Sequence, residues 1–94
     1  MTDDKTCTIE EVDVSTSLGK PYKVILFNDD HHDQVEVAAQ IIQAIHCTPE
    51  RAMQIMLEAH KSGRAIVITA SLERCELVEE ILSQIQLGTK IEEA

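Results

Sequence analysis

The chain is built around one run of residues, Tyr22-Lys23-Val24-Ile25-Leu26-Phe27-Asn28-Asp29-Asp30. Its first six residues are strand formers with a single lysine, and three polar residues with two carboxylates follow directly. Side chains alternate along a strand, so Leu26 and Asn28 lie on one face. Ile25 and Phe27 then lie on the other. We therefore expect a buried strand that carries an amide and two acids to its own end, where a site can form.

Capping patterns mark where the helices begin. Asp33, with Glu36 three residues later, is typical of a helix cap and its reciprocal partner. Thr48 before Pro49, and Ser71 further on, begin two more helices, because their hydroxyls can accept the free N–H groups of a first turn. The predicted elements, in chain order, are a strand at 22–27, helices near 34–46 and 49–61, a strand at 64–69, a helix after Ser71 and a last strand near 89–92.

Apolar residues recur every three or four positions in the predicted helices, which predicts one buried face on each. The face of the first helix begins at Val35, that of the second is continued by His60, and that of the third begins at Arg74. The order β-α-α-β-α-β fits an α+β fold. We expect a small antiparallel three-stranded sheet packed against three helices, formed by residues 21–94 and preceded by a flexible arm at residues 1–20.

Composition narrows the range of functions. The 94 residues suffice for one small domain, and the formal net charge of −9 leaves no basic stripe for a nucleic acid. Apolar runs are far shorter than the roughly 20 residues that cross a bilayer, and the N-terminus lacks a signal pattern, so we expect a cytoplasmic protein without a membrane partner. Cys7, Cys47 and Cys75 fit neither a disulfide framework nor a zinc site. These observations point toward protein partners.

Asn28, Asp29 and His60 could form a binding site if the second predicted helix brings His60 beside the end of the first strand. An amide oxygen, a carboxylate and a neutral imidazole would then offer three acceptors. A primary ammonium has three N–H donors and one positive charge, so this trio would satisfy it. An apolar hole beside it would be lined by Leu26, Val37 and Met56. The predicted ligand is a peptide N-terminus whose first side chain is hydrophobic.

Three runs of residues carry a family resemblance. The run 22–30 is the first. The other two are Glu50-Arg51-Ala52 and Met56-Leu57-Glu58-Ala59-His60-Lys61-Ser62-Gly63-Arg64-Ala65, and the spacing between the runs needs no insertion or deletion to match the family. Together they resemble ClpS, the adaptor of bacterial Clp proteases, and the resemblance extends from Pro21 to the end of the chain. It implies a small α+β domain that binds hydrophobic N-terminal residues (N-degrons) of substrate proteins. It also implies delivery of these substrates to an AAA+ Clp unfoldase, ClpA-like or ClpC-like.

The same resemblance assigns roles to individual residues. It makes Asn28, Asp29 and His60 the binders of the peptide α-amino group, with Asp30 as support. Gln34 stands at the gatekeeper position, which is commonly Met or Phe in the family. The residues at positions that wall the hydrophobic pocket are Leu26, Val37, Met56 and Ala59.

Two segments depart from the family pattern. The run His31-His32-Asp33-Gln34-Val35-Glu36 replaces a segment that usually begins with an aromatic residue. Glu73 and Glu76 match positions on the helix that docks the unfoldase, but the lysine usual there is Val78. The amine site is therefore expected to be intact, while the preferred side chain and the docking partner stay open.

Three other functions fit parts of the sequence. Metal-ligand residue types occur together at Asp29, Asp30, His31, His32 and Asp33, but adjacent histidines rarely reach one tetrahedral ion. An enzyme is disfavoured because no Ser, Cys or glycine loop accompanies the possible Asp–His pair. The main alternative is a ligand-free module that docks an unfoldase through its acidic helix. We expect no catalysis, no metal and no cofactor, and a monomer.

Overall fold

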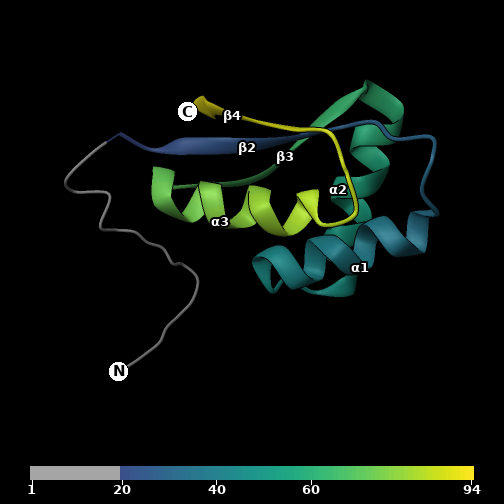
Figure 1. Ribbon diagram of the computed structural model, residues 1–94. Helices are drawn as coiled ribbons and strands as arrows, with labels where there is room; N and C mark the ends of the chain where they lie inside the picture. The colour runs from purple at the N-terminus through teal and green to yellow at the C-terminus, as the bar shows by residue number, and fades with distance from the viewer. Residues whose placement is uncertain (1–19) are drawn as a thin grey trace.

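The computed structural model describes residues 20–94, so the predicted arm at residues 1–20 lies outside the described part except for Lys20. Three helices pack against a three-stranded antiparallel sheet (Figure 1), which confirms the expected fold class. The predicted elements all occur, close to their predicted ends. Their bounds are β2 Tyr22–Phe27, α1 Gln34–Ile45, α2 Pro49–Ser62, β3 Arg64–Ala70, α3 Leu72–Ser83 and β4 Thr89–Glu93.

The first predicted strand, β2, is the centre of the sheet, whose strand order is β3-β2-β4. It is antiparallel to both neighbours, with Leu26 opposite Ala65 on β3 and opposite Thr89 on β4. A bulge interrupts the pairing with β3 between Val24 and Ile25. Because a central strand is paired along both edges, the polar residues that follow it leave from a fixed backbone.

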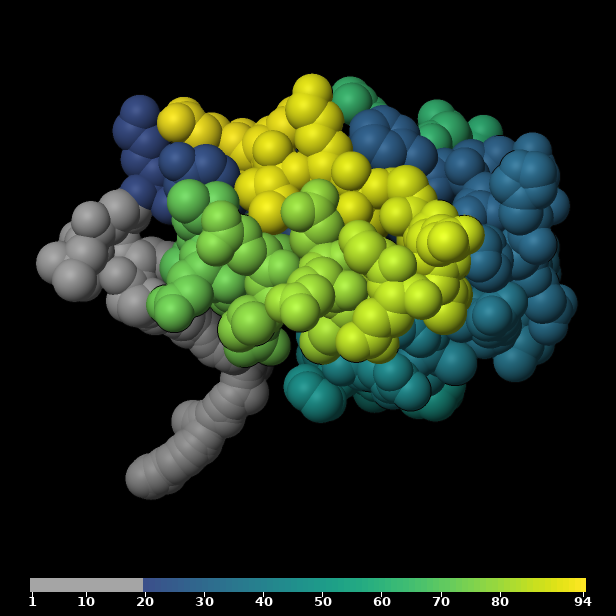
Figure 2. Space-filling view, in the orientation of Figure 1, coloured from purple at the N-terminus to yellow at the C-terminus, as the bar shows by residue number. Residues whose placement is uncertain are grey.

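One apolar core lies between the sheet and the helices. Its centre is formed by side chains that are at most 1% exposed, Val24 and Leu26 on β2, Ile41 on α1, Ile55 on α2 and Val78 on α3. The atoms of α3 and β4 lie side by side on the face shown in Figure 2. The hydroxyl of Thr89 on β4 donates a 3.1 Å hydrogen bond to the carboxylate of Glu79 on α3. No helix within residues 20–94 combines the length and apolarity needed to cross a bilayer.

Two of the predicted helix caps are confirmed. The Thr48 hydroxyl accepts the backbone N–H of Arg51 at 3.1 Å and begins α2. The Ser71 hydroxyl accepts the backbone N–H of Arg74 at 3.3 Å and begins α3. Each bond satisfies one of the N–H groups that a first turn leaves without a helical partner.

The third predicted cap is wrong. Asp33 occupies the N-cap position of α1, but its side chain makes no capping hydrogen bond. In the segment before the helix, the carboxylate of Asp29 accepts the backbone N–H groups of His31 and His32. The segment between β2 and α1 is therefore shaped by the acid at its beginning.

Five side chains predicted for apolar helix faces are exposed, namely Val35, Met53, Leu57, His60 and Arg74. Val35 is 67% exposed because it lies two residues, about 200° of helical rotation, before the buried Val37. Arg74 adjoins buried residues of α3, but a guanidinium keeps its charged end in water unless it is paired. His60 follows the buried Ala59 in the last turn of α2, where it borders a cavity.

Candidate functional site

A cavity of about 30 Å³ opens at the end of β2, between the first turns of α1 and the last turns of α2. The three predicted amine-binding residues and all the predicted pocket residues meet around it. Two further residues, Phe27 and His32, complete the lining. The predicted members are Leu26, Asn28, Asp29, Gln34, Val37, Met56, Ala59 and His60.

The inner wall of the cavity is apolar. It consists of side chains that are between 1% and 6% exposed, Leu26, Val37, Met56 and Ala59. Gln34 is exposed at the first residue of α1 and borders the same cavity. The space is thus apolar inside, with an amide at its solvent side.

Backbone hydrogen bonds fix the polar end of the cavity. The N–H of Phe27 donates to the carbonyl of Gly88, and the N–H of Asn28 donates to the carbonyl of Gly63, both at 2.9 Å. Gly63 ends α2 with a φ of 90° and donates its own N–H to the carbonyl of Ala59 at 2.9 Å. The end of β2 and the last turn of α2, which carries His60, are therefore joined through one glycine.

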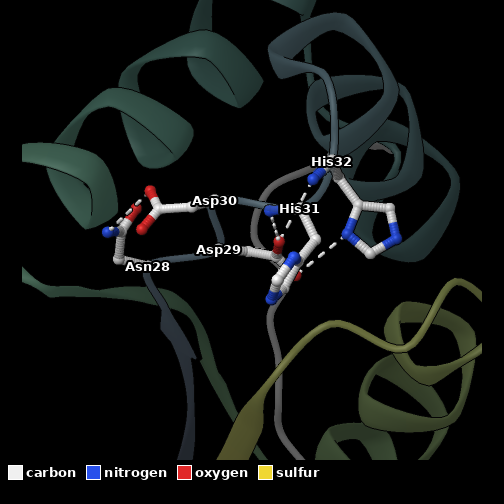
Figure 3. A network of polar contacts seen from close by, with 5 residues as sticks. All are labelled: Asn28, Asp29, Asp30, His31 and His32. Carbon is white, nitrogen blue, oxygen red and sulfur yellow. Dashed lines mark hydrogen bonds and ion pairs between the residues drawn. The ribbon is translucent and has the colours of Figure 1, made fainter.

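Asp30 lies outside the cavity lining but contacts Asn28 (Figure 3). The side-chain nitrogen of Asn28 donates to Oδ1 of Asp30 at 3.4 Å. With its NH₂ group directed at Asp30, the Asn28 amide keeps its oxygen as an acceptor. This geometry is what a supporting role for Asp30 requires.

Asp29 gives the cavity its negative charge. Its Oδ1 accepts the backbone N–H groups of His31 at 2.6 Å and of His32 at 3.2 Å, and its Oδ2 lies 2.9 Å from Nδ1 of His32 (Figure 3). Burial raises the pKa of this carboxyl, but the hydrogen bonds from His31 and His32 outweigh burial and hold the pKa below its usual value. Asp29 is therefore ionised at neutral pH.

His32 and Phe27 are the lining residues that the sequence did not assign to this site. In the sequence, His32 belongs to the divergent segment and to the possible metal-ligand cluster. Its side chain is 19% exposed and pairs with Asp29, and an Asp followed three residues later by a His on a turn is a signal that could have indicated the pair. Phe27 was placed on the opposite face of the strand, but it is the last strand residue and borders the cavity where the chain leaves the sheet.

The histidines and acids after β2 do not form a metal cluster in the described part of the chain. Within residues 20–94 no three His, Cys, Asp or Glu side chains are close enough together to hold an ion. The contact that does form in this segment is the pair of His32 and Asp29.

Glu73 and Glu76 are exposed on α3, at the other end of the sheet from the cavity. The helix begins just after Ala70, which pairs with Tyr22 at the start of β2. Figure 1 shows that β2 runs from this end of the sheet to the other. The cavity is lined by residues at and beyond Phe27, where β2 ends. The predicted docking residues and the predicted peptide site therefore occupy different parts of the surface.

Comparison with known proteins gives a family match and close relatives. The family described as "ATP-dependent Clp protease adaptor protein ClpS" matches residues 18–89. The ClpS adapter of Gloeobacter violaceus is 38% identical over 86 residues, which is 90% of this chain and 92% of that protein. The ClpS adapter of Synechococcus elongatus is 33% identical over 88 residues, which is 90% of this chain and 93% of that protein.

A solved structure has the same fold. Agrobacterium tumefaciens ClpS2, bound to L-phenylalaninamide, matches with a TM-score of 0.75 and 22% identity over 80% of this chain and 98% of that chain. At this identity the likeness shows the fold, and it agrees with the three helices and antiparallel sheet described above.

Proposed function

This chain belongs to the ClpS family of Clp protease adaptors, and we propose that it binds the hydrophobic N-terminal residue of substrate proteins through Asn28, Asp29 and His60. It then delivers these substrates to an AAA+ Clp unfoldase. The observation that carries this proposal is the meeting of all three residues around one cavity with an apolar inner wall.

The polar end of the cavity suits a peptide α-ammonium. The oxygen of Asn28, the carboxylate of Asp29 and a neutral nitrogen of His60 are acceptors for its three N–H donors. The ionised Asp29 also offsets the positive charge, which lowers the cost of taking an ammonium out of water. An acetylated N-terminus has one N–H donor and no charge, so it would lose two of the three hydrogen bonds and the charge interaction with Asp29.

The apolar wall suits the first side chain of such a peptide. Leu26, Val37 and Met56 are almost fully buried and leave room beside the amine site. The L-phenylalaninamide bound to Agrobacterium tumefaciens ClpS2 has a free amino group and an apolar side chain, which is the combination that this cavity would take. Gln34 occupies the gatekeeper position and makes the solvent side of the cavity more polar.

Glu73 and Glu76 are proposed to dock the unfoldase, which we take to be ClpA-like or ClpC-like. Both are exposed, and both lie away from the cavity. A substrate held in the cavity could then stay bound while α3 contacts the unfoldase. In this scheme residues 21–94 are the folded unit and residues 1–20 an arm, and the chain acts as a cytoplasmic monomer that has no catalytic step of its own.

The proposal is tested by titrating the chain with fluorescent peptides that begin with Leu, Phe, Trp, Tyr, Val or Met, each beside its N-acetylated twin. We expect at least one free peptide to bind and every acetylated twin to bind much more weakly. The alternative, a ligand-free module that docks an unfoldase through α3, predicts that no peptide binds while the unfoldase still does. Equal binding of free and acetylated peptides would contradict the amine site.

A further inference from the structure

We infer that His32 is a positioning residue of the amine site: its ring Nδ1–H donates to Oδ2 of Asp29 and holds that carboxylate toward the ligand. The inference rests on the proposed function, since the carboxylate matters here as the partner of a peptide ammonium. It assigns a role to a residue of the divergent segment between β2 and α1.

The two oxygens of Asp29 are used differently. Oδ1 accepts two backbone N–H groups, from His31 at 2.6 Å and from His32 at 3.2 Å, so its capacity is taken up by the turn. Oδ2 accepts one contact, from the His32 ring at 2.9 Å, and keeps a lone pair for a ligand. The orientation of this second oxygen therefore depends on His32.

The surroundings make this contact effective. The side chains of His32 and Asp29 are 19% and 12% exposed, and both line the cavity. A charge-assisted hydrogen bond is stronger where water is largely excluded. Without the His32 donor, the Asp29 carboxylate would be held only through Oδ1 and could rotate away from the ligand.

An imidazole in its neutral form can donate to Asp29 without cancelling the carboxylate charge. The titratable residues that line the cavity are Asp29 and His32 between β2 and α1, and His60 on α2. The lining from β2 and α1 is uncharged, with Leu26 and Val37 inside and Gln34 at the solvent side. A protonated His32 would neutralise Asp29 and repel an ammonium, so acid should weaken binding through two imidazoles instead of one.

The experiment uses the full chain and a fluorescein-labelled peptide that begins with Phe, with its N-acetylated twin, at pH 7.5 and pH 5.5. These values lie on either side of the range in which imidazole groups change charge. His32→Ala removes the donor. His32→Asn keeps an N–H donor near the position of Nδ1 but cannot titrate. His31→Ala is the matched control, because it removes the neighbouring imidazole and keeps the backbone N–H that Asp29 accepts.

At pH 7.5 we expect His32→Ala to bind the free peptide about tenfold more weakly, the scale of one charge-assisted hydrogen bond. His32→Asn and His31→Ala should stay within about twofold of the wild type. Between pH 7.5 and pH 5.5 the wild type should lose more affinity than His32→Asn, in which His60 is the remaining imidazole of the lining. Circular dichroism melts of each variant check that the fold is retained.

Two results would overturn this inference and leave the proposed function standing. In the first, the wild type binds the free peptide more tightly than the acetylated one, and both His32 variants have the wild-type affinity at both pH values. The other is tighter binding by His32→Ala at pH 7.5, since the ring would then compete with the ligand. Equal binding of the two peptides by the wild type would overturn the proposed function and this inference together.

Discussion

The backbone N–H of Asn28 donates a 2.9 Å hydrogen bond to the carbonyl of Gly63, which ties the end of β2 to the end of α2. Gly63 has a φ of 90° and also closes the last helical turn through Ala59. His60 lies within that turn. The backbone positions of Asn28 and His60 are therefore linked by two hydrogen bonds through Gly63.

Gly63→Ala should destabilise the fold by about 1–2 kcal/mol, because an L-residue is strained at positive φ. A Cβ at this position would meet no atom within 4 Å, so the cost is one of backbone conformation. Urea unfolding measures it. The matched control is Gly88→Ala, whose Cβ would lie 3.8 Å from Cβ of Phe27 in ordinary contact, and whose effect should be neutral or stabilising by up to about 1 kcal/mol. Equal losses in both variants would show that the φ of Gly63 is unimportant.

His60→Ala should weaken binding of a Phe-initiated peptide by about 2–4 kcal/mol, the scale of breaking a buried charge-assisted contact. Its melting temperature should hardly change, because His60 is exposed. Asp29→Ala should lose similar affinity and also some stability, since Asp29 accepts the N–H groups of its turn. Calorimetry measures the affinities. Lys61→Ala is the control, because Lys61 follows His60 on α2. Unchanged affinity in both variants would place the site elsewhere.

Gln34→Met should tighten binding of Leu- and Phe-initiated peptides by roughly 0.5–1.5 kcal/mol, the scale of burying one or two methylenes. Gln34 borders the cavity, and its amide must stay hydrated or find a partner. Val35→Met is the matched control, because that neighbouring position is 67% exposed and lies outside the lining. The same affinities for wild type and Gln34→Met with Leu, Phe and Val peptides would exclude Gln34 from the pocket.

Asp29→Asn should lower stability at pH 7 by an amount that disappears in acid. The pKa of Asp29 lies below its usual value of 3.8 in the folded chain, because hydrogen bonds from His31 and His32 outweigh burial. A lowered folded-state pKa stabilises the fold above the unfolded pKa, and this contribution is lost as pH falls through the folded value. Urea unfolding at pH 7, 4 and 2.5 should show the difference between wild type and variant shrinking below about pH 4. If the difference in unfolding free energy stayed the same at all three pH values, the substitution would act through packing and hydrogen bonding and not through the carboxylate charge.

Charge reversal of Glu73 and Glu76 to Lys should weaken binding of a ClpA-like or ClpC-like unfoldase by about tenfold or more, because it replaces two carboxylates of the proposed docking surface with ammonium groups. Peptide affinity should stay unchanged, since both residues lie at the other end of the sheet from the cavity. Glu80→Lys on the same helix is the control. Loss of peptide binding in the double variant would mean that the two surfaces are not independent.

The sequence by itself determined the elements of this fold. The helix starts at Thr48 and Ser71 depend on hydrogen bonds between residues three positions apart. The strand at 22–27 and the polar run after Phe27 are indicated by the types of neighbouring residues. Such local features follow from side-chain alternation, helical spacing and local hydrogen bonding, all of which can be recognised from spacing alone. The family resemblance added which distant residues share a site, because related chains keep the same packing.

Only the tertiary structure decided which groups are in contact. Spacing favoured Asp33 as the cap of α1, yet its side chain makes no capping bond. Asp29 instead accepts the N–H groups of His31 and His32 before the helix and pairs with the His32 ring. Val35 fits an apolar period but points away from the core. A carboxylate has several donors within reach along its own turn, and the donor that it takes depends on how β2 and α1 are packed. The energies of these local choices differ little, so long-range packing selects among them.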